Sequence, residues 1–240
     1  MNLTIFNRSI TKGAEICDEL GLDPAVVCPT TLKVNSEFNK VALLHNATHE
    51  SIFFEGLNRQ YYNFILKDFS YFQFSYTEIT QDPNLVDKYD IRLAYYPNPA
   101  NSYDGKPEST LDQLHIFSEF YLNGDWEFEE YSQALSELQV NIRAPIIRYD
   151  MSESQFKKVN HPKAHFHIGI NNSSRMATNR IFTPELFTMF ILNLFYRNEW
   201  ENLSGEGFSL ECRMELLKNN CENLNGQHFC GVQGGIINII

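Results

Sequence analysis

The sequence predicts an α+β protein in which helices pack on a mostly antiparallel sheet, and three observations lead to this prediction. Aromatic side chains make up 14% of the 240 residues, and many occur in runs that alternate with polar residues, as in half-buried strands. Strand-like runs and helical patterns come in groups along the chain, without the regular alternation of a parallel sheet. Apolar residues at 43% and charged residues at 20% are typical of a soluble globular protein. We expect a single domain over residues 1–240.

The predicted elements of the first half are one helix followed by strands. The helix covers residues 11–22 and ends at Gly21. Four runs suited to strands follow, at residues 38–44, 51–54, 69–79 and 89–96. In the third run Phe72 and Phe74 alternate with polar residues, the pattern of a half-buried strand. The polar segment 80–88 joins the last two runs, so we expect them to form an antiparallel pair.

The second half begins with a predicted loop at residues 98–110, which is rich in Pro, Asn, Ser and Gly. The elements expected after it are helices at 110–122 and 127–138, strands at 146–151 and 164–171, a helix that starts at Thr183, and a helix at 210–217. The helix at Thr183 has the strongest signal, because Thr183 can cap it and Pro184 suits its first position.

The run from His161 to Gly169 is the stretch that points to chemistry, since it holds three of the seven histidines. Successive side chains of a strand point to opposite faces. His165 and His167 should therefore share one face, and Gly169 beside them would allow close approach of a backbone. Four apolar residues should share the other, core-facing side: Ala164, Phe166, Ile168 and Ile170. Paired imidazoles can bind a metal, hold a phosphate or exchange protons near neutral pH.

These histidines lie in the one basic segment of an acidic chain. Residues 141–180 contain seven basic and two acidic side chains, a net charge of +5. The whole chain carries −11, which leaves −16 on the other 200 residues. The overall charge argues against a general nucleic-acid binder, but the local excess favours an anionic ligand at the histidine face. The alternative is that these basic side chains only solvate the ends of a strand.

A series of spaced motifs supports a family resemblance. The motifs are Arg92–Pro99, Arg148-Tyr149-Asp150, His161-Pro162, His165–Gly169, Arg175, Arg180, Thr183-Pro184 and Phe187–Tyr196. This series, within about residues 69–196, resembles an uncharacterised bacterial family, number 2290 in the domain-of-unknown-function series. The resemblance implies a bacterial origin and a place near defence or mobile-element genes, but no activity and no assigned site residues. The part at about 205–240 resembles no family that we can name.

A divalent metal such as zinc is the candidate cofactor. Zinc accepts imidazole ligands, and His165 and His167 could share an ion, with His161 reaching in from the preceding turn. Asp150 could be a further ligand if its strand pairs with the histidine strand. The Cys-x-x-Cys spacing of a zinc ribbon is missing from the C-terminal group of Cys212, Cys221, His228 and Cys230.

A metal-free phosphodiesterase is the second hypothesis. One of His165 and His167 would act as general base and the other as general acid. The arginines available to hold the phosphate are Arg148, Arg175 and Arg180. Arg148 and Asp150 share one face of their strand and would position the histidines, unless they form a plain surface ion pair. An RNA substrate could supply its own 2′-hydroxyl as nucleophile. The predicted activity is phosphodiester cleavage in RNA or a nucleotide.

Other interpretations fit the same residues. The three histidines could be structural, donating hydrogen bonds to carboxylates or carbonyls. The protein could also be a non-catalytic recognition or regulatory subunit that binds a partner protein or nucleic acid, or an acidic, antitoxin-like partner of a basic protein. Tyr95 and Tyr96 could stack on bases, but few basic residues lie near them, so a core role is favoured.

The expected location is the cytoplasm, with no membrane partner. No apolar run approaches the roughly 20 residues that a membrane crossing requires, and residues 1–10 lack the apolar core of a signal peptide. The five cysteines are an odd number without a disulfide pattern, so we expect reduced thiols.

Overall fold

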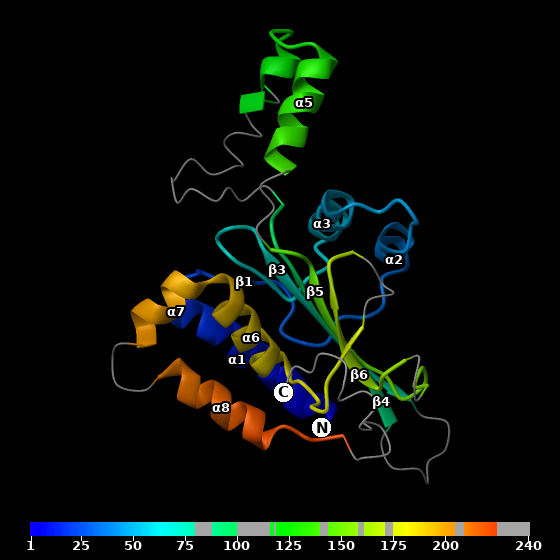
Figure 1. Cartoon of the computed structure of the whole chain (residues 1–240), viewed down its shortest axis with the longest axis vertical. Helices are drawn as coiled ribbons and strands as arrows, with labels where there is room; N and C mark the ends of the chain where they lie inside the picture. Colours follow the sequence, from blue (N-terminus) through cyan, green and yellow to red (C-terminus); the bar gives the residue numbers. More distant parts are fainter. Residues whose placement is uncertain are drawn as a thin grey trace.

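The α+β fold is confirmed by a computed structural model of the chain, in which a seven-stranded antiparallel sheet carries helices on both faces (Figure 1). The structure describes residues 1–79, 88–99, 116–117, 119–139, 144–157, 161–170, 175–204 and 209–224. Within this part of the chain, no helix has the length and apolarity that a membrane crossing requires. The four cysteines in it, Cys17, Cys28, Cys212 and Cys221, are free thiols, as expected.

The strands follow one another across the sheet in the order of the sequence, each antiparallel to the next. They are β1 (Ala25–Val26), β2 (Phe64–Ile65), β3 (Tyr71–Ile79), β4 (Lys88–Tyr96), β5 (Ile147–Met151), β6 (Ala164–Ile168) and β7 (Met176–Ala177). The strands predicted at 69–79, 89–96, 146–151 and 164–171 are confirmed, and so is the pairing of the first two. β6 ends at Ile168 because Gly169 adopts a φ of +78°, which glycine tolerates best.

Seven helices of the described residues have defined bounds, three in the N-terminal part and four after β4. They are α1 (Leu3–Glu19), α2 (Ser36–Ala42), α3 (His49–Asn58), α5 (Phe128–Gln139), α6 (Pro184–Phe195), α7 (Arg197–Ser204) and α8 (Leu210–Asn220). The predicted helices at 127–138 and 210–217 and the cap at Thr183 are confirmed; the Thr183 side chain accepts a hydrogen bond from the Leu186 amide at 3.2 Å. The first helix starts earlier than predicted, because Asn2 caps it.

The two strands predicted at 38–44 and 51–54 are wrong, since these segments lie in α2 and α3. Asn35 caps α2 by accepting from two backbone amides, and Thr48 and Ser51 cap α3 reciprocally. The aromatic and β-branched content of both segments favoured strands, but the caps and the packing of one apolar stripe determine the structure.

Some predicted elements lie wholly or largely outside the described residues. These are the loop at 98–110 and the connection at 80–88; of the unassigned part at about 205–240, residues 205–208 and 225–240 also lie outside. Of the helix predicted at 110–122, residues 116–117 and 119–122 are described and helical. Together with α5 they form a helical hairpin that projects away from the sheet at the top of Figure 1.

One face of the sheet packs against α1 and α6 to form the larger core. Its members come from the strands and from both helices: Phe6, Ile10, Phe72, Phe74, Leu93, Tyr149, Phe166, Leu186 and Phe187 are all buried. Ala164 is buried too, as predicted, whereas Ile168 and Ile170 are 42% and 46% exposed because they lie at and beyond the end of β6.

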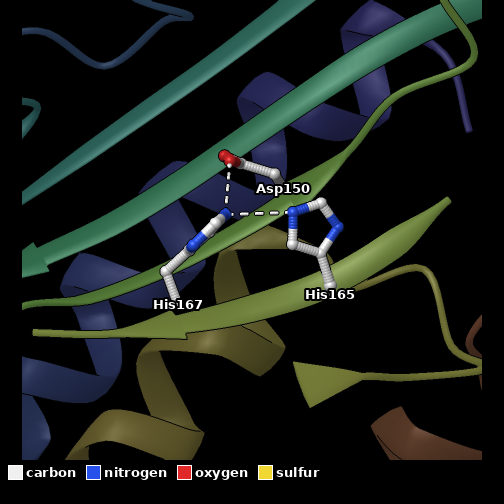
Figure 2. Close-up of side chains that lie close together, drawn as sticks. All are labelled: Asp150, His165 and His167. Carbon is white, nitrogen blue, oxygen red and sulfur yellow. Dashed lines mark hydrogen bonds and ion pairs between the residues drawn. The ribbon is translucent and has the colours of Figure 1, made fainter. Parts of the chain in front are cut away.

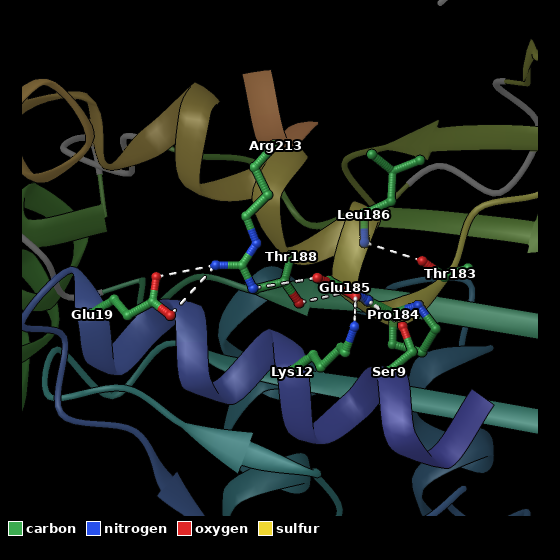
Figure 3. Close-up of polar contacts among 9 residues, drawn as sticks. All are labelled: Ser9, Lys12, Glu19, Thr183, Pro184, Glu185, Leu186, Thr188 and Arg213. Carbon is green, nitrogen blue, oxygen red and sulfur yellow. Dashed lines mark hydrogen bonds and ion pairs between the residues drawn. The ribbon is translucent and has the colours of Figure 1, made fainter. Parts of the chain in front are cut away.

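A buried carboxylate joins the helices on this side (Figure 3). Glu185, at the start of α6, is 5% exposed and lies 3.7 Å from Lys12 of α1 and 3.4 Å from Arg213 of α8. Arg213 also contacts Glu19 at 3.1 Å, and the Ser9 hydroxyl accepts from the Glu185 amide. These contacts fix three helices to one another over the apolar face of the sheet.

Of the described helices, α2 and α3 cover one end of the other face of the sheet (Figure 1). There α2 and α3 contribute Phe38, Ile52 and Phe53, which pack with Tyr71 and Tyr96 in a second core cluster. Tyr95 and Tyr96 are 2% and 6% exposed, so the prediction of a core role for them is confirmed. Beyond this cluster the same face carries polar side chains from four adjacent strands, and the candidate site lies there.

Candidate functional site

The register of β4, β5 and β6 brings the predicted site residues together. Asp150 lies opposite His165 on one side and opposite Arg92 on the other, and Arg148 lies opposite His167. Because side chains alternate along each strand, all five project from the same face. The predicted sharing of one face by His165 and His167 is therefore confirmed.

Asp150, His165 and His167 form a compact cluster (Figure 2). The two Nε2 atoms of the histidines are 3.0 Å apart, and Nε2 of His167 is 3.4 Å from Oδ2 of Asp150. On the far side of its ring, Nδ1 of His165 is 2.9 Å from the carbonyl oxygen of Pro162. A turn just before β6 thus orients the first histidine, and β5 supplies the carboxylate.

These contacts determine where the protons lie. The Pro162 carbonyl only accepts, so Nδ1 of His165 donates to it, and Nε2 of a neutral His165 is a lone pair. The 3.0 Å contact is then a hydrogen bond only if Nε2 of His167 donates. In that tautomer Nδ1 of His167 is also a lone pair, and it is buried with no hydrogen-bond partner among the described residues. The pair therefore shares one proton between two Nε2 atoms.

Asp150 is the anionic centre of the cluster. Its Oδ2 accepts from Nε of Arg148 at 3.0 Å, and its Oδ1 accepts from Nε of Arg92 at 3.3 Å. Burial alone would raise the pKa of the Asp150 carboxyl, but the hydrogen bond with His167 and the two guanidinium groups hold it well below its usual range. Asp150 is therefore a carboxylate at neutral pH.

Both histidines of the cluster are buried and uncharged. His165 is 0% exposed and His167 is 3% exposed. Burial, with the neighbouring His167 as the next cause, lowers the pKa of His165 to about 4. Burial also lowers the pKa of His167, against the opposing effect of Asp150. Both rings lie beneath the surface in this conformation, so neither contacts a ligand bound at the surface.

A pocket of about 310 Å³ opens on the same face between the sheet and α2. Its basic wall consists of Arg92, Arg148, His161 and Arg175. We call this cavity the arginine pocket. Tyr61 and Tyr96 also line it, as do apolar side chains of α2. Arg148 lines the pocket and holds Asp150, so the pocket and the histidine cluster share a side chain.

His161 is the histidine that reaches the arginine pocket. Its ring packs edge-on against His165, with the ring centroids 4.8 Å apart. Its Nδ1 has no hydrogen-bond partner among the described residues. Burial, followed by the charge of Arg175, lowers the pKa of His161. A neutral imidazole at the pocket wall can accept a proton.

Comparison with known families assigns the chain. A family model described as "Uncharacterized conserved protein (DUF2290)" matches residues 26–230. The chain belongs to this family. The DUF2290 match extends beyond the motifs at 69–196 on both sides and includes α2, α3 and α8. No curated protein and no solved structure matches the chain.

The structure of this DUF2290 chain does not bring every predicted site residue together. The guanidinium of Arg180 donates to the carbonyl of Lys218 at the end of α8, on the face of the sheet that packs against α1 and α6. Tyr149, whose side chain belongs to the larger core, donates to the Arg180 carbonyl at 3.0 Å. Arg180 is therefore away from the histidine face. A Cβ added at Gly169 would meet no atom within 4 Å, so this glycine serves the chain through its positive φ and not through close approach.

Two residues of the DUF2290 site were missed by the sequence analysis. Arg92 lies between Ile91 and Leu93, so strand alternation would have predicted its place on the polar face of β4. Its contact with Asp150 depends on the pairing of β4 with β5, which are separated by 50 residues of chain. Tyr61 lies in the turn after α3 and carries no such signal.

Proposed function

We propose that the chain binds a phosphate-bearing ligand, an RNA or a nucleotide, in the arginine pocket and cleaves a phosphodiester bond there. The observation that supports this is the convergence of three arginines and one histidine on a single cavity: Arg92, Arg148, Arg175 and His161. Guanidinium groups suit phosphate because they offer parallel donors and keep their charge. Asp150 neutralises part of this charge and holds two of the arginines in position.

The size and lining of the pocket suit a nucleotide. Its volume of about 310 Å³ lies at the lower end of ordinary small-molecule sites. The ring of Tyr61 at its wall offers a surface on which a base can stack. The bacterial origin and cytoplasmic location expected from the sequence, and a place near defence genes, belong to the same proposal.

His161 is the proton-transfer group in this proposal, in place of the buried His165 and His167. With RNA, the 2′-oxygen bonds to phosphorus while the bond to the 5′-oxygen breaks. The 2′ proton passes to His161, and the 5′-oxygen takes a proton from water. The arginines stabilise the charge that develops on the phosphoryl oxygens. His165 and His167 then act through His161, as positioning residues.

The test compares binding and cleavage of a short labelled RNA by the wild type and three variants. Arg175→Gln should weaken binding about tenfold, whereas His161→Asn should retain binding and lose cleavage. Arg197→Gln is the matched control, since Arg197 is exposed and pairs with Glu201 one turn away. Equal binding by wild type and Arg175→Gln, or equal cleavage by wild type and His161→Asn, would overturn the proposal.

A second candidate function is recognition of a basic partner protein without catalysis. It is supported by the burial of His165 and His167 and by the projecting hairpin. Residues 116–139 contain six acidic side chains and no basic one. Among them Leu122 and Phe128 are 80% and 61% exposed. This function would be excluded if Arg175→Gln loses RNA binding or cleavage while the hairpin variant Leu122→Ser/Phe128→Ser retains both. Capture of a lysine-rich protein by the wild type, but not by the hairpin variant, would favour it.

A further inference from the structure

We propose that Asp150, His165 and His167 bind one divalent metal ion, and that zinc is the ion that fits them best. One ligand atom from each residue lies within 4.8 Å of the other two. Neutral imidazole and carboxylate are ordinary zinc ligands, and three protein ligands with one open position are typical of a catalytic zinc. The proposal does not depend on phosphodiester cleavage, so each can fail without the other.

The distances in the cluster already approach those of a zinc site. Ligand atoms about 2.0–2.2 Å from zinc lie roughly 3.3–3.6 Å apart at the corners of a tetrahedron. The Nε2 atoms of His165 and His167 are 3.0 Å apart, and Nε2 of His167 is 3.4 Å from Oδ2 of Asp150. All three ligand atoms lie within 4.8 Å of one another, so small movements of these side chains would bring them to the corners around one ion.

Two of the three candidate ligands, His165 and Asp150, have the contacts that metal ligands usually receive. A ligating histidine usually donates its other ring N–H to a carbonyl or carboxylate, which fixes the ring and its tautomer. His165 does this through Nδ1 and the Pro162 carbonyl at 2.9 Å. Asp150 is held by Arg148 and Arg92, so its carboxylate is also oriented before a metal binds.

The proton count favours a cation in the cluster. When both histidines are neutral, the single proton on Nε2 of His167 lies between two acceptors, Nε2 of His165 and Oδ2 of Asp150. If His167 moved its proton from Nε2 to Nδ1, a divalent cation would accept one lone pair from each of the three residues.

The charge of the site links the metal to the arginine pocket. Arg92 and Arg148 already exceed the charge of Asp150 by one, and a divalent cation would raise the local charge to +3. An anion in the pocket would offset this excess. Zinc and phosphate should therefore strengthen each other's binding by the same factor, as linkage requires.

The experiment measures zinc by elemental analysis of the purified protein and by titration of chelator-stripped protein, with and without inorganic phosphate. We expect about one zinc per wild-type chain and tighter zinc binding in phosphate. His167→Asn and Asp150→Asn should each weaken zinc binding by at least about tenfold. His49→Gln is the matched control, because His49 is a buried histidine outside the cluster and is hydrogen-bonded to the Pro97 carbonyl.

Two further readouts keep the test decisive if a variant fails to fold. Cobalt added to the stripped wild type should give the visible absorption of a tetrahedral site, and a chelator should lower the melting temperature of the wild type. Stripped wild type that binds no zinc and shows no chelator effect would overturn the metal site. Zinc bound equally by His167→Asn and wild type would overturn it too. If RNA cleavage persists in either case, the proposed function stands without the metal site.

Discussion

Arg92 and Asp150 lie opposite each other on β4 and β5, and Nε of Arg92 is 3.3 Å from Oδ1 of Asp150 across 58 residues of sequence. The other carboxylate oxygen accepts from Arg148, two residues earlier on the same strand. One half-buried carboxylate therefore holds two guanidinium groups at the wall of the arginine pocket and contacts His167 beneath it. The stability of the sheet and the charge of the pocket both depend on Asp150.

Replacement of Asp150 by asparagine should destabilise the metal-free protein by about 2 kcal/mol, because two guanidinium groups and a buried imidazole lose their anionic partner. Urea unfolding in the presence of a chelator measures this loss. Glu201→Gln removes an exposed partner of Arg197 at 2.6 Å and should cost less than about 0.5 kcal/mol. Equal losses in the two variants would mean that Asp150 is only a surface carboxylate.

The salt dependence of RNA binding should report the arginines that contact phosphate. Each phosphate contact on a single strand contributes about 0.7 to the slope of log K against log salt concentration. Arg175→Gln should therefore lower the magnitude of this slope by about 0.7, and Arg197→Gln, at an exposed position outside the pocket, should leave it unchanged. Binding curves at several salt concentrations give the slopes, and an unchanged slope for Arg175→Gln would remove Arg175 from the phosphate site.

Local patterns predicted the histidine face because strand alternation alone determines it. His165 and His167 had to share a face once residues 164–168 form a strand, and Arg148 and Asp150 follow the same rule on β5. Strand alternation could not predict how deeply the histidines are buried or which strands lie next to them. The burial of His165 depends on tertiary packing around β6. The contact between Arg92 and Asp150 depends on the pairing of β4 with β5, which a long connection separates in the sequence.

The wrong strand predictions have a similar cause. Residues 38–44 and 51–54 contain aromatic and β-branched side chains, which suit either a strand or the buried side of a short helix. The decisive signals were the caps at Asn35 and Thr48, which act on backbone amides one turn ahead. Arg180 lies away from the site because its guanidinium contacts the end of α8. No local sequence pattern predicts where α8 packs relative to the sheet.

The packing of α3 on the sheet should not tolerate a side chain at Gly56. A Cβ there would overlap Oη of Tyr71, which is fully buried and donates to the Phe53 carbonyl at 3.1 Å. Gly56→Ala should destabilise the protein by about 2 kcal/mol, although alanine favours the helix. Tyr71→Phe removes the closest atom, so the double variant should lose less than the sum of the single losses. Additive losses, measured by urea unfolding, would contradict this contact.

The free energy of unfolding should decrease as the pH decreases, and the protonation of His49 should contribute to this decrease. His49 is 9% exposed, and burial lowers its pKa despite its 2.9 Å hydrogen bond with the Pro97 carbonyl and the nearby Glu50. As the pH falls through about 6.5, the unfolded chain takes up a proton at this residue more readily than the folded chain. The contribution of His49 to folding stability is therefore complete above that pH and decreases below it.

Two histidine variants measure this contribution by urea unfolding between about pH 7.5 and about pH 5.5, a range that spans the ordinary histidine pKa. His49→Gln keeps an N–H donor for the Pro97 carbonyl but cannot titrate, so it should lose less stability than the wild type as the pH falls. His45→Gln, at an exposed position, should follow the wild type. A parallel decline of all three proteins would show that His49 does not contribute to the pH dependence.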